Sequence, residues 1–221
     1  MSLNDDIRAV LAPPHPAGRG FLLVGLLITI AGMVFAAWLF WCGVLFLLVC
    51  LVFFRDPERV PPERPDAVLA PADGRIVAIE SRAPPAELGL SQTPRWCVSI
   101  FLSVLNVHVN RVPADGTVTR IAYRHGQFRN ASYADASDVN ERNAIAFRLS
   151  DGREIALVQV AGLIARRILC DLREGDAVRA GSRFGFIRFG SRTDLYLPEG
   201  VRPLVVEGQT MIGGETVIAV L

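Results

Sequence analysis

The residues best suited to chemistry are a serine, two histidines and an aspartate. Ser191, in the stretch FGSRTDLYLP, offers a hydroxyl that becomes a good nucleophile only when a neighbouring base takes its proton. His108 in SVLNVHVNRVP and His125 in AYRHGQF could supply that base. His108 lies on an alternating apolar stretch, so its side chain is expected to point away from its valine neighbours and into a cavity. Asp73, in PADGR, offers a carboxylate, and each of these residues also has an ordinary structural explanation, such as a turn.

Several kinds of active site are excluded by what the sequence lacks. No G-x-S-x-G motif surrounds Ser191, which argues against a serine hydrolase. The 3 histidines show no metal-ligand spacing and no nearby cluster of cysteines or carboxylates, so we expect no metal site. All 23 basic residues are arginine. Without lysine, neither a pyridoxal enzyme of the usual kind nor a lipoyl or biotinyl carrier can be built.

The elements that must position these residues are mainly β-strands. Beyond residue 68 the chain shows short apolar alternations separated by Gly, Pro and Asp, a pattern typical of strands. Residues 150–153, SDGR, predict a tight hairpin, because Asp-Gly accepts positive φ angles. The only helix candidate in this part is weak and covers residues 163–170. The number of strands favours a barrel or a sandwich.

The N-terminal part is dominated by residues 21–54, a run of 34 residues without Asp, Glu, Lys, Arg or His. One helix needs about 20 apolar residues to cross a bilayer, so this run is expected to enter lipid. Positively charged residues, which favour the cytoplasmic side, flank both of its ends: Arg8, Arg19, Arg55, Arg59 and Arg64. The flanks predict a helical hairpin with both ends in the cytoplasm. Its bend is expected near residues 38–43, where aromatics and glycine cluster. A re-entrant hairpin and a single tilted helix are the alternatives.

The chain therefore divides into a tail (1–20), a membrane-inserting hairpin (21–54), a proline-rich connector (55–67) and a main domain (68–221). The 4 cysteines form no C-x-x-C pair, which fits a reducing, cytoplasmic compartment. The net charge of +1 gives no basic footprint for nucleic acid. We expect a protein on the cytoplasmic side of the cell membrane that does not bind nucleic acid.

Two stretches of the main domain resemble the barrel-sandwich hybrids found in biotinyl and lipoyl domains. Residues 171–190, DLREGDAVRAGSRFGFIRFG, are similar to the hammerhead segment, and residues 68–80, VLAPADGRIVAIE, to the opening strand–turn–strand. The resemblance implies a mainly β, barrel-sandwich-hybrid-like fold. It does not imply a carrier, because no lysine is present to be modified.

Taken together, the motifs resemble one enzyme family. The order of FFRDPER, PADGR, FLSVLNVHVNRVP, NERNA and finally FGS with YLP is similar to the short bacterial and archaeal form of phosphatidylserine decarboxylase, from about residue 20 onward. The resemblance implies conversion of phosphatidylserine to phosphatidylethanolamine and CO₂ at the membrane. A decarboxylase of an archaeal-type serine phospholipid and a noncatalytic membrane-anchored adaptor are the alternatives.

The resemblance also implies how the site is made. The Ser191 hydroxyl attacks the Gly190 carbonyl, the chain is cut between these residues, and Ser191 becomes a pyruvoyl group. This covalent cofactor forms a Schiff base with the substrate amine and serves as the electron sink. The products are two chains, residues 1–190 and 191–221, held together by the β-core. The oligomeric state stays open, with a homo-oligomer among the alternatives.

The same resemblance suggests roles for the other candidates. His108 is the expected base, and Asp73 the carboxylate that orients it. Longer members of the family carry Y-H-x-x-H, whereas here His108 takes the first histidine position and Arg111 the second. Many short members have His-Pro-Gly-Lys where residues 124–127 read RHGQ, so His125 is retained as a second candidate for the proton transfer.

Overall fold

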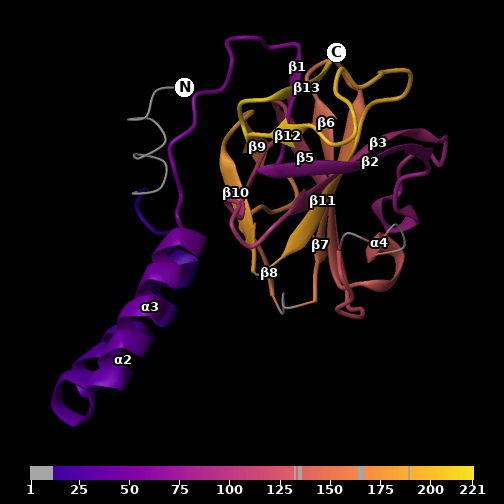
Figure 1. Cartoon of the computed structure of the whole chain (residues 1–221). Coiled ribbons are helices and arrows are strands. Elements are labelled where there is room, and N and C mark those ends of the chain that lie inside the picture. The colour runs from indigo at the N-terminus through magenta and orange to yellow at the C-terminus, as the bar shows by residue number, and fades with distance from the viewer. Residues whose placement is uncertain (1–11, 132, 134–135, 164–166, 189) are drawn as a thin grey trace. The chain divides into compact units, whose positions relative to one another are not determined.

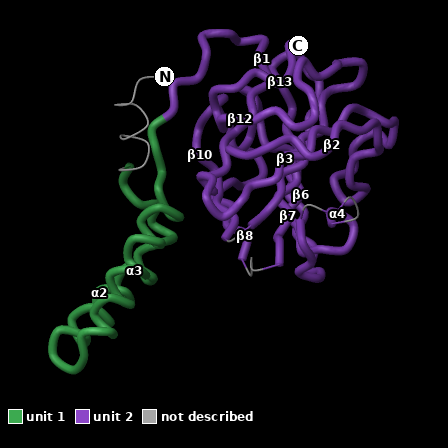
Figure 2. The backbone as a smooth tube through the Cα atoms, in the orientation of Figure 1, with its two compact units in different colours: residues 1–58 green, residues 59–221 purple. Residues whose placement is uncertain are grey.

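The computed structural model describes residues 12–131, 133, 136–163, 167–188 and 190–221. It divides the chain into two compact units, residues 1–58 and residues 59–221 (Figure 2). The first unit is helical and the second is mainly β, as the sequence predicts (Figure 1).

Unit 1 is an antiparallel hairpin of two apolar helices, α2 (Arg19–Phe35) and α3 (Ala37–Phe53), preceded by the 3-10 turn η1 (Pro16–Gly18). The helical hairpin is as expected, but the bend predicted at residues 38–43 is wrong. The chain reverses at Ala36, whose extended backbone (φ −166°, ψ 132°) separates the two helices.

The glycines of the hairpin explain this difference, because they serve helix packing rather than the bend. A methyl group on Gly43 would lie 2.4 Å from Thr29 Oγ1, and one on Gly32 would lie 2.1 Å from the Phe40 backbone nitrogen. Only glycine allows the two helices to approach so closely. The aromatic and glycine cluster that suggested a bend therefore belongs to the contact between the helices.

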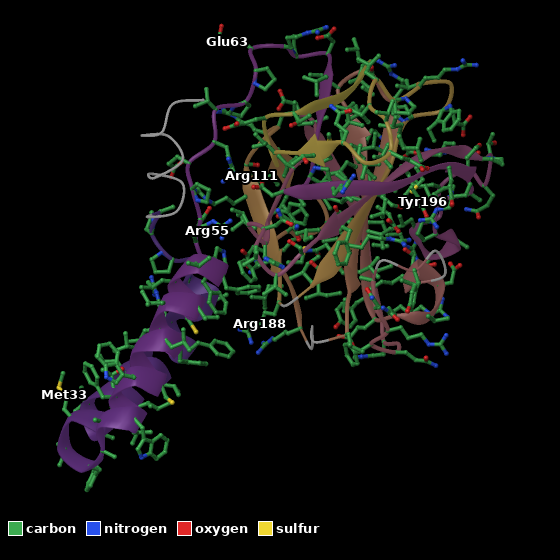
Figure 3. All side chains as sticks on the ribbon, viewed as in Figure 1. Met33, Arg55, Glu63, Arg111, Arg188 and Tyr196 are labelled. Atoms are coloured by element: carbon green, nitrogen blue, oxygen red, sulfur yellow. The ribbon has the colours of Figure 1, made fainter. Side chains whose placement is uncertain are left out.

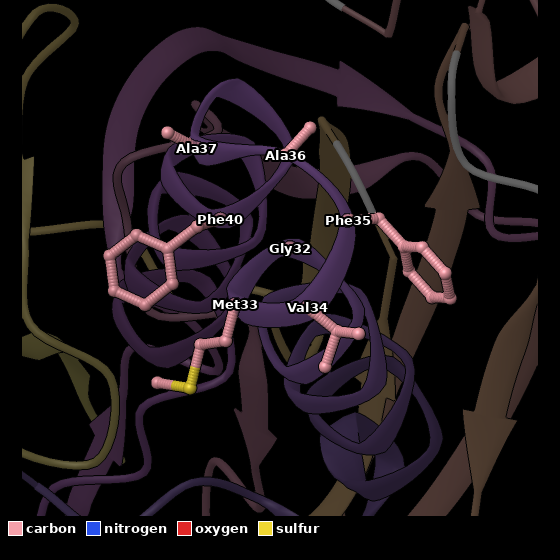
Figure 4. A pocket seen from close by; sticks show the side chains of 7 residues that line it. All are labelled: Gly32, Met33, Val34, Phe35, Ala36, Ala37 and Phe40. Carbon is pink, nitrogen blue, oxygen red and sulfur yellow. The ribbon is translucent and has the colours of Figure 1, made fainter.

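Much of the hairpin's apolar surface is exposed. The helical segment Pro16–Phe35 has 20 residues and is long and apolar enough to cross a membrane, whereas α3 has 17. A shallow pocket at the bend is lined by apolar side chains that include Met33, Phe35 and Phe40 (Figure 4). Trp41 is also largely exposed on α3. Such a surface is unfavourable in water and suits an apolar environment.

Unit 2 is built from short strands with little helix. Its strands are β1 (Ala67–Leu69), β2 (Gly74–Arg82), β3 (Arg95–Leu102), β4 (Val109–Arg111), β5 (Gly116–Arg124), β6 (Arg142–Leu149), β7 (Glu154–Ala161), β8 (Ile168–Cys170), β9 (Ala177–Val178), β10 (Arg183–Ile187), β11 (Ser191–Tyr196), β12 (Thr210–Met211) and β13 (Val217–Val220). The helical pieces of this unit are the 3-10 turn η2 (Ala86–Leu88) and the one-turn helix α4 (Ala136–Val139).

The strands form one large curled sheet and two small sheets. The large sheet has the order β12-β2-β3-β11-β7-β6-β5-β9, and the small ones are β4-β10-β8 and β1-β13. Neighbouring strands in all three run antiparallel. The concave face of the large sheet carries a core in which Ile100, Ile145, Leu157, Phe184 and Leu195 are buried. This curled half-barrel agrees with the predicted mainly β, barrel-like class.

Two local predictions have opposite outcomes. The hairpin at residues 150–153 is confirmed: it joins β6 to β7, and Gly152 has φ +86°. The weak helix at residues 163–170 is wrong where the structure describes it, because Ile168–Cys170 forms strand β8. Pairing with β10 overrides the local helical tendency there.

The register of the large sheet gathers several strand ends at one place. Ser191, the first residue of β11, lies between Leu102 at the end of β3 and Ala161 at the end of β7. Strand β5 ends and strand β6 begins at the same level, where Arg124 pairs with Arg142. We call this the Ser191 end of unit 2. It is the lower end in Figure 1, where β7 and β8 are labelled.

Candidate active site

Ser191 is fully buried at the start of an interior strand. Alternation along β11 places its side chain on the same face as Thr193 and Leu195, and Leu195 belongs to the core. The Ser191 hydroxyl makes no hydrogen bond with any residue of the described chain. A buried hydroxyl without a partner costs about 1–3 kcal/mol, so its retention calls for a functional reason.

Gly190 presents its peptide bond to Ser191 in a special conformation. Its φ of +65° lies in the left-handed region that glycine adopts readily. Its carbonyl oxygen lies against Gly162, where an added methyl group would come within 1.9 Å of that oxygen. The carbonyl that the serine would attack is therefore held in a space that only glycine leaves open. Phe189, the first residue of the FGS motif, lies outside the described residues.

His108 is buried immediately before β4. Its Nδ1 lies 2.9 Å from the carbonyl oxygen of Asn106. A carbonyl can only accept, so Nδ1 carries the proton and Nε2 is the basic nitrogen of the neutral ring. The backbone carbonyl of His108 accepts a hydrogen bond from Ile187 N, 3.4 Å away, and Ile187 is four residues before Ser191. The His108 backbone is thus paired with the end of β10, and the centroid of its ring lies 6.1 Å from that of Phe186 in the same strand.

Asp73 lies in the turn before β2, at the same end of the sheet. Its carboxylate accepts hydrogen bonds from Arg59 Nη2 (2.7 Å) and from the backbone N–H of Gly213 (2.8 Å). Strand β3 separates β2 from β11, so the backbones of Asp73 and Ser191 are about 10 Å apart, two strand spacings. Arg111, at the second histidine position, donates from Nη1 to the Gly181 carbonyl oxygen at 2.9 Å.

His125 lies at the rim rather than in the interior. Its side chain is 89% exposed, and its Nδ1 is 3.6 Å from Glu141 Oε2. Tyr123 donates its hydroxyl proton to the other oxygen of Glu141. Partial burial, followed by this carboxylate, raises the pKa of Tyr123 to about 12. Among the described residues, no three His, Cys, Asp or Glu side chains gather in a way that could hold a metal ion.

The structure adds a buried polar row that the sequence analysis missed. One step inward from Ser191, Thr193, Gln159 and Asn143 pair directly across β11, β7 and β6. Asn143 donates to Gln159 (2.9 Å), and Gln159 donates to Asn110 Oδ1 of β4 (2.8 Å). The amide nitrogen of Asn110 and the hydroxyl of Thr193 have no hydrogen-bond partner among the described residues. The row therefore presents two buried polar groups beside Ser191.

A signal for this row was present in the sequence. Asn143, Gln159 and Thr193 stand at inward positions of strands whose next inward residues are apolar. A polar residue on the apolar face of a strand is unusual and marks a specific contact.

The opposite face of β11 carries a buried charge cluster. The Asp194 carboxylate accepts hydrogen bonds from Arg192 Nε (2.8 Å), from Arg82 Nη2 (2.8 Å) and from the Ser137 hydroxyl. Burial opposes the charge of Asp194, but the two guanidinium groups and these hydrogen bonds hold its pKa below the usual value. Arg192 also donates to the Tyr133 carbonyl (2.8 Å). The cluster therefore ties the segment around α4 to the strand that begins at Ser191.

Comparisons with known proteins point to one enzyme family. The family model described as phosphatidylserine decarboxylase matches residues 46–219. A phosphatidylserine decarboxylase proenzyme of Granulibacter bethesdensis is 65% identical over 99% of this chain and 90% of its own length. Proteins of the same description from Gluconobacter oxydans and Mycobacterium tuberculosis are 58% and 50% identical, over 100% and 96% of this chain and 100% and 92% of their own. On this similarity, the chain belongs to the phosphatidylserine decarboxylase family.

Proposed function

We propose that the chain is a self-processing decarboxylase, anchored in the membrane, that converts phosphatidylserine to phosphatidylethanolamine and CO₂ with a pyruvoyl group made from Ser191. Family membership favours an enzyme over the noncatalytic adaptor. The observation that carries the proposal is the buried Ser191 hydroxyl, which has no described hydrogen-bond partner and follows a glycine of positive φ.

Self-cleavage needs only groups of the chain and one water. The Ser191 oxygen bonds to the Gly190 carbonyl carbon, the peptide C–N bond breaks, and the proton of the hydroxyl ends on the freed amine. Loss of the α-proton of residue 191 then breaks the new ester at its Cβ–O bond and releases Gly190 as a carboxylate. One water hydrolyses the remaining enamine to the pyruvoyl group and ammonia. Gly162 supports the first step by leaving room for the Gly190 carbonyl.

His108 is the proposed base of this sequence. Because the Asn106 carbonyl holds its Nδ1 proton, Nε2 is free of a proton and can take one from the Ser191 hydroxyl. Asp73, at the same end of the sheet, is the proposed carboxylate whose negative charge orients and stabilises the imidazolium. Its contacts to Arg59 and Gly213 fix the position of that charge. His125, on the exposed rim beside Glu141, is the second candidate.

The pyruvoyl carbonyl, once formed, supplies an electron sink for the carbanion left by loss of CO₂. The chain's own task is then to return a proton to the substrate α-carbon, and protonated His108 Nε2 is the proposed donor. The buried position of Ser191 keeps bulk water away from the reacting atoms. Asn110 and Thr193 offer polar groups to orient a bound head group.

The apolar hairpin supports the membrane part of the proposal. Its exposed apolar helices suit a membrane, and the arginines at both flanks favour a cytoplasmic location for both ends. The catalytic unit is then on the cytoplasmic side, beside the leaflet that holds the substrate. Residues 1–190 and 191–221 remain together as two chains from one precursor.

Intact-mass spectrometry of the purified full chain tests the proposal. We expect two species, residues 1–190 and residues 191–221 with a pyruvoyl N-terminus, and release of CO₂ from phosphatidylserine. Ser191→Ala removes the nucleophile and should give a single uncut, inactive species. An uncut wild-type chain that still decarboxylates phosphatidylserine would refute the pyruvoyl mechanism.

A further inference from the structure

The Ser191 end of unit 2 is formed by four connections. Their described residues are 103–108 after β3, 125–131, 133 and 136–141 between β5 and β6, 162, 163 and 167 after β7, and 188 and 190 before Ser191. The register of β3, β11, β7 and β6 brings these connections to one end of the sheet. The Gly190–Ser191 peptide bond, at which the cut is proposed, therefore lies among these connections.

Exposed apolar side chains are concentrated at this end. In the described part of unit 2, eight large apolar side chains are exposed, and five of them lie here: Val104, Leu105, Tyr123, Tyr133 and Leu163. Leu105 is 74% exposed and Leu163 is 67% exposed, each in a different connection. Gathering of exposed apolar side chains around one site marks an interaction surface.

Positive charge accompanies these apolar residues. Arg124, Arg129 and Arg167 are exposed at the same end. Arg188, which is labelled in Figure 3, is partly exposed. The backbone N–H of Arg188 donates to the Arg167 carbonyl at 3.4 Å, so the two guanidinium groups start from neighbouring backbone positions. Burial and the charge of Arg167 both lower the pKa of Arg188. Two arginines held together in this way favour an anion between or beside them.

The described acidic residues of these connections, Glu141 and Asp138, are each engaged with another group. Glu141 is buried, and its carboxylate is engaged by Tyr123 and faces His125. Asp138 is exposed on α4 and lies 3.9 Å from Arg142, which it partly neutralises. The described surface at this end is therefore apolar and basic, the combination that binds an anionic bilayer.

We propose that the Ser191 end of unit 2 is a second membrane-contact surface, in which the apolar loop residues enter the interface of an anionic phospholipid bilayer and the arginines contact lipid phosphates. The choice of phosphatidylserine as the lipid delivered there rests on the proposed function. A lipid bound at this surface would present its head group at the end of the sheet where Ser191 lies, while its acyl chains stay in the bilayer. A second copy of this chain is the competing occupant, and its own basic surface would repel it.

Photocrosslinking tests the surface without requiring activity. The full chain would carry p-benzoylphenylalanine at position 163 or, as the matched control, at position 204, and would be reconstituted in nanodiscs containing phosphatidylserine. Leu204 is 66% exposed in the connection between β11 and β12, away from the four connections. We expect lipid adducts from position 163 and few from position 204. Crosslinked chain dimers from position 163, or equal lipid adducts from both positions, would overturn the proposal.

A kinetic comparison separates this inference from the proposed function. The double variant Leu105→Ser/Leu163→Ser should lose about tenfold in kcat/KM for phosphatidylserine in anionic vesicles, relative to its kcat/KM for a monomeric short-chain phosphatidylserine. The control Leu204→Ser/Val206→Ser should leave that ratio unchanged. Equal loss on both substrates would refute membrane contact at these loops. Inactivity of the wild type on both substrates would instead count against the decarboxylase, leaving the crosslinking result to decide on the surface.

Discussion

His108 and His125 differ most in their surroundings. His108 is buried with its tautomer set by the Asn106 carbonyl, whereas His125 is 89% exposed beside Glu141. We expect His108→Ala to lose decarboxylation and to process slowly or not at all, because the buried base is removed. His125→Ala should keep processing and activity within about threefold, as is typical of an exposed site. A denaturing gel and a CO₂ assay on both variants check this, and the reverse pattern would transfer the role of base to His125.

Gly162 gives a prediction about the scissile carbonyl rather than the base. Gly162→Ala would drive a methyl group into the Gly190 oxygen, so we expect cleavage to slow by at least about 100-fold, in line with the cost of small misplacements at reacting atoms. The matched control is Gly20→Ala, where an added methyl group meets nothing within 4 Å. Time courses of cleavage after synthesis measure the effect. Normal cleavage of a folded Gly162→Ala chain would show that the carbonyl is held by other contacts.

The candidate residues show what sequence can and cannot supply. Motif resemblance was enough to select Ser191, His108 and Asp73, because each stands in a short, distinctive stretch. It could not supply the Asn106 carbonyl or the Arg59 contact of Asp73, since these depend on how loops fold back in space. In particular, the partner of a backbone carbonyl cannot be read from the type of residue that carries it.

At the scale of elements, strand β11 contributes functional candidates to one face of the large sheet and a charge cluster to the other. Its inner face carries Ser191 and Thr193, and its outer face carries Arg192 and Asp194. Asp194→Asn would leave the buried Arg192 guanidinium without its charge partner and is expected to destabilise the fold by about 3 kcal/mol. Thermal unfolding at neutral pH measures this loss. A melting temperature unchanged within about 1 °C would show that the cluster is dispensable.

The contribution of the Asp194 carboxylate to the stability of the fold depends on pH. The pKa of Asp194 is lowered in the folded state, so its stabilisation is present above the unfolded pKa of about 4 and is lost as pH falls through the folded pKa. The wild type should therefore lose stability in acid over that range. The Asp194→Asn variant should lose less stability over the same pH range. The difference between the melting temperatures of the wild type and the variant should therefore narrow as pH falls.

Strands were easier to predict than the reversal in the hairpin. Alternation identifies β2 and β5, which have one face more buried than the other, whereas β6 and β7 are short apolar runs buried on both faces. The bend at Ala36 was missed because glycine next to aromatics has two meanings, a turn or a close helix contact. Only the distance between α2 and α3 distinguishes them. Strand β8 was missed for a related reason, since its pairing partner β10 is distant in sequence.

At the scale of the whole molecule, the proposed membrane anchor leads to a prediction about the side of the membrane on which the two ends of the hairpin lie. We expect both ends of the hairpin in the cytoplasm, so single cysteines replacing Arg8 and Arg64 should both resist an impermeant thiol reagent in intact cells. Both should react once the cells are opened. Labelling of only one of the two in intact cells would favour a single crossing helix over the hairpin.

Strand β11 begins at Ser191 and is paired on both sides, with β3 and with β7, over all of its residues. A cut before Ser191 therefore leaves residues 191–221 as a separate polypeptide that supplies an interior strand to the larger chain. Folding of the precursor is a reaction of one molecule, but recovery of the cut enzyme requires two molecules to meet, and its rate depends on concentration. If the chain is cut as proposed, the barrier to unfolding therefore protects the two-chain enzyme more than it protects the precursor, because recovery of the cut enzyme slows on dilution.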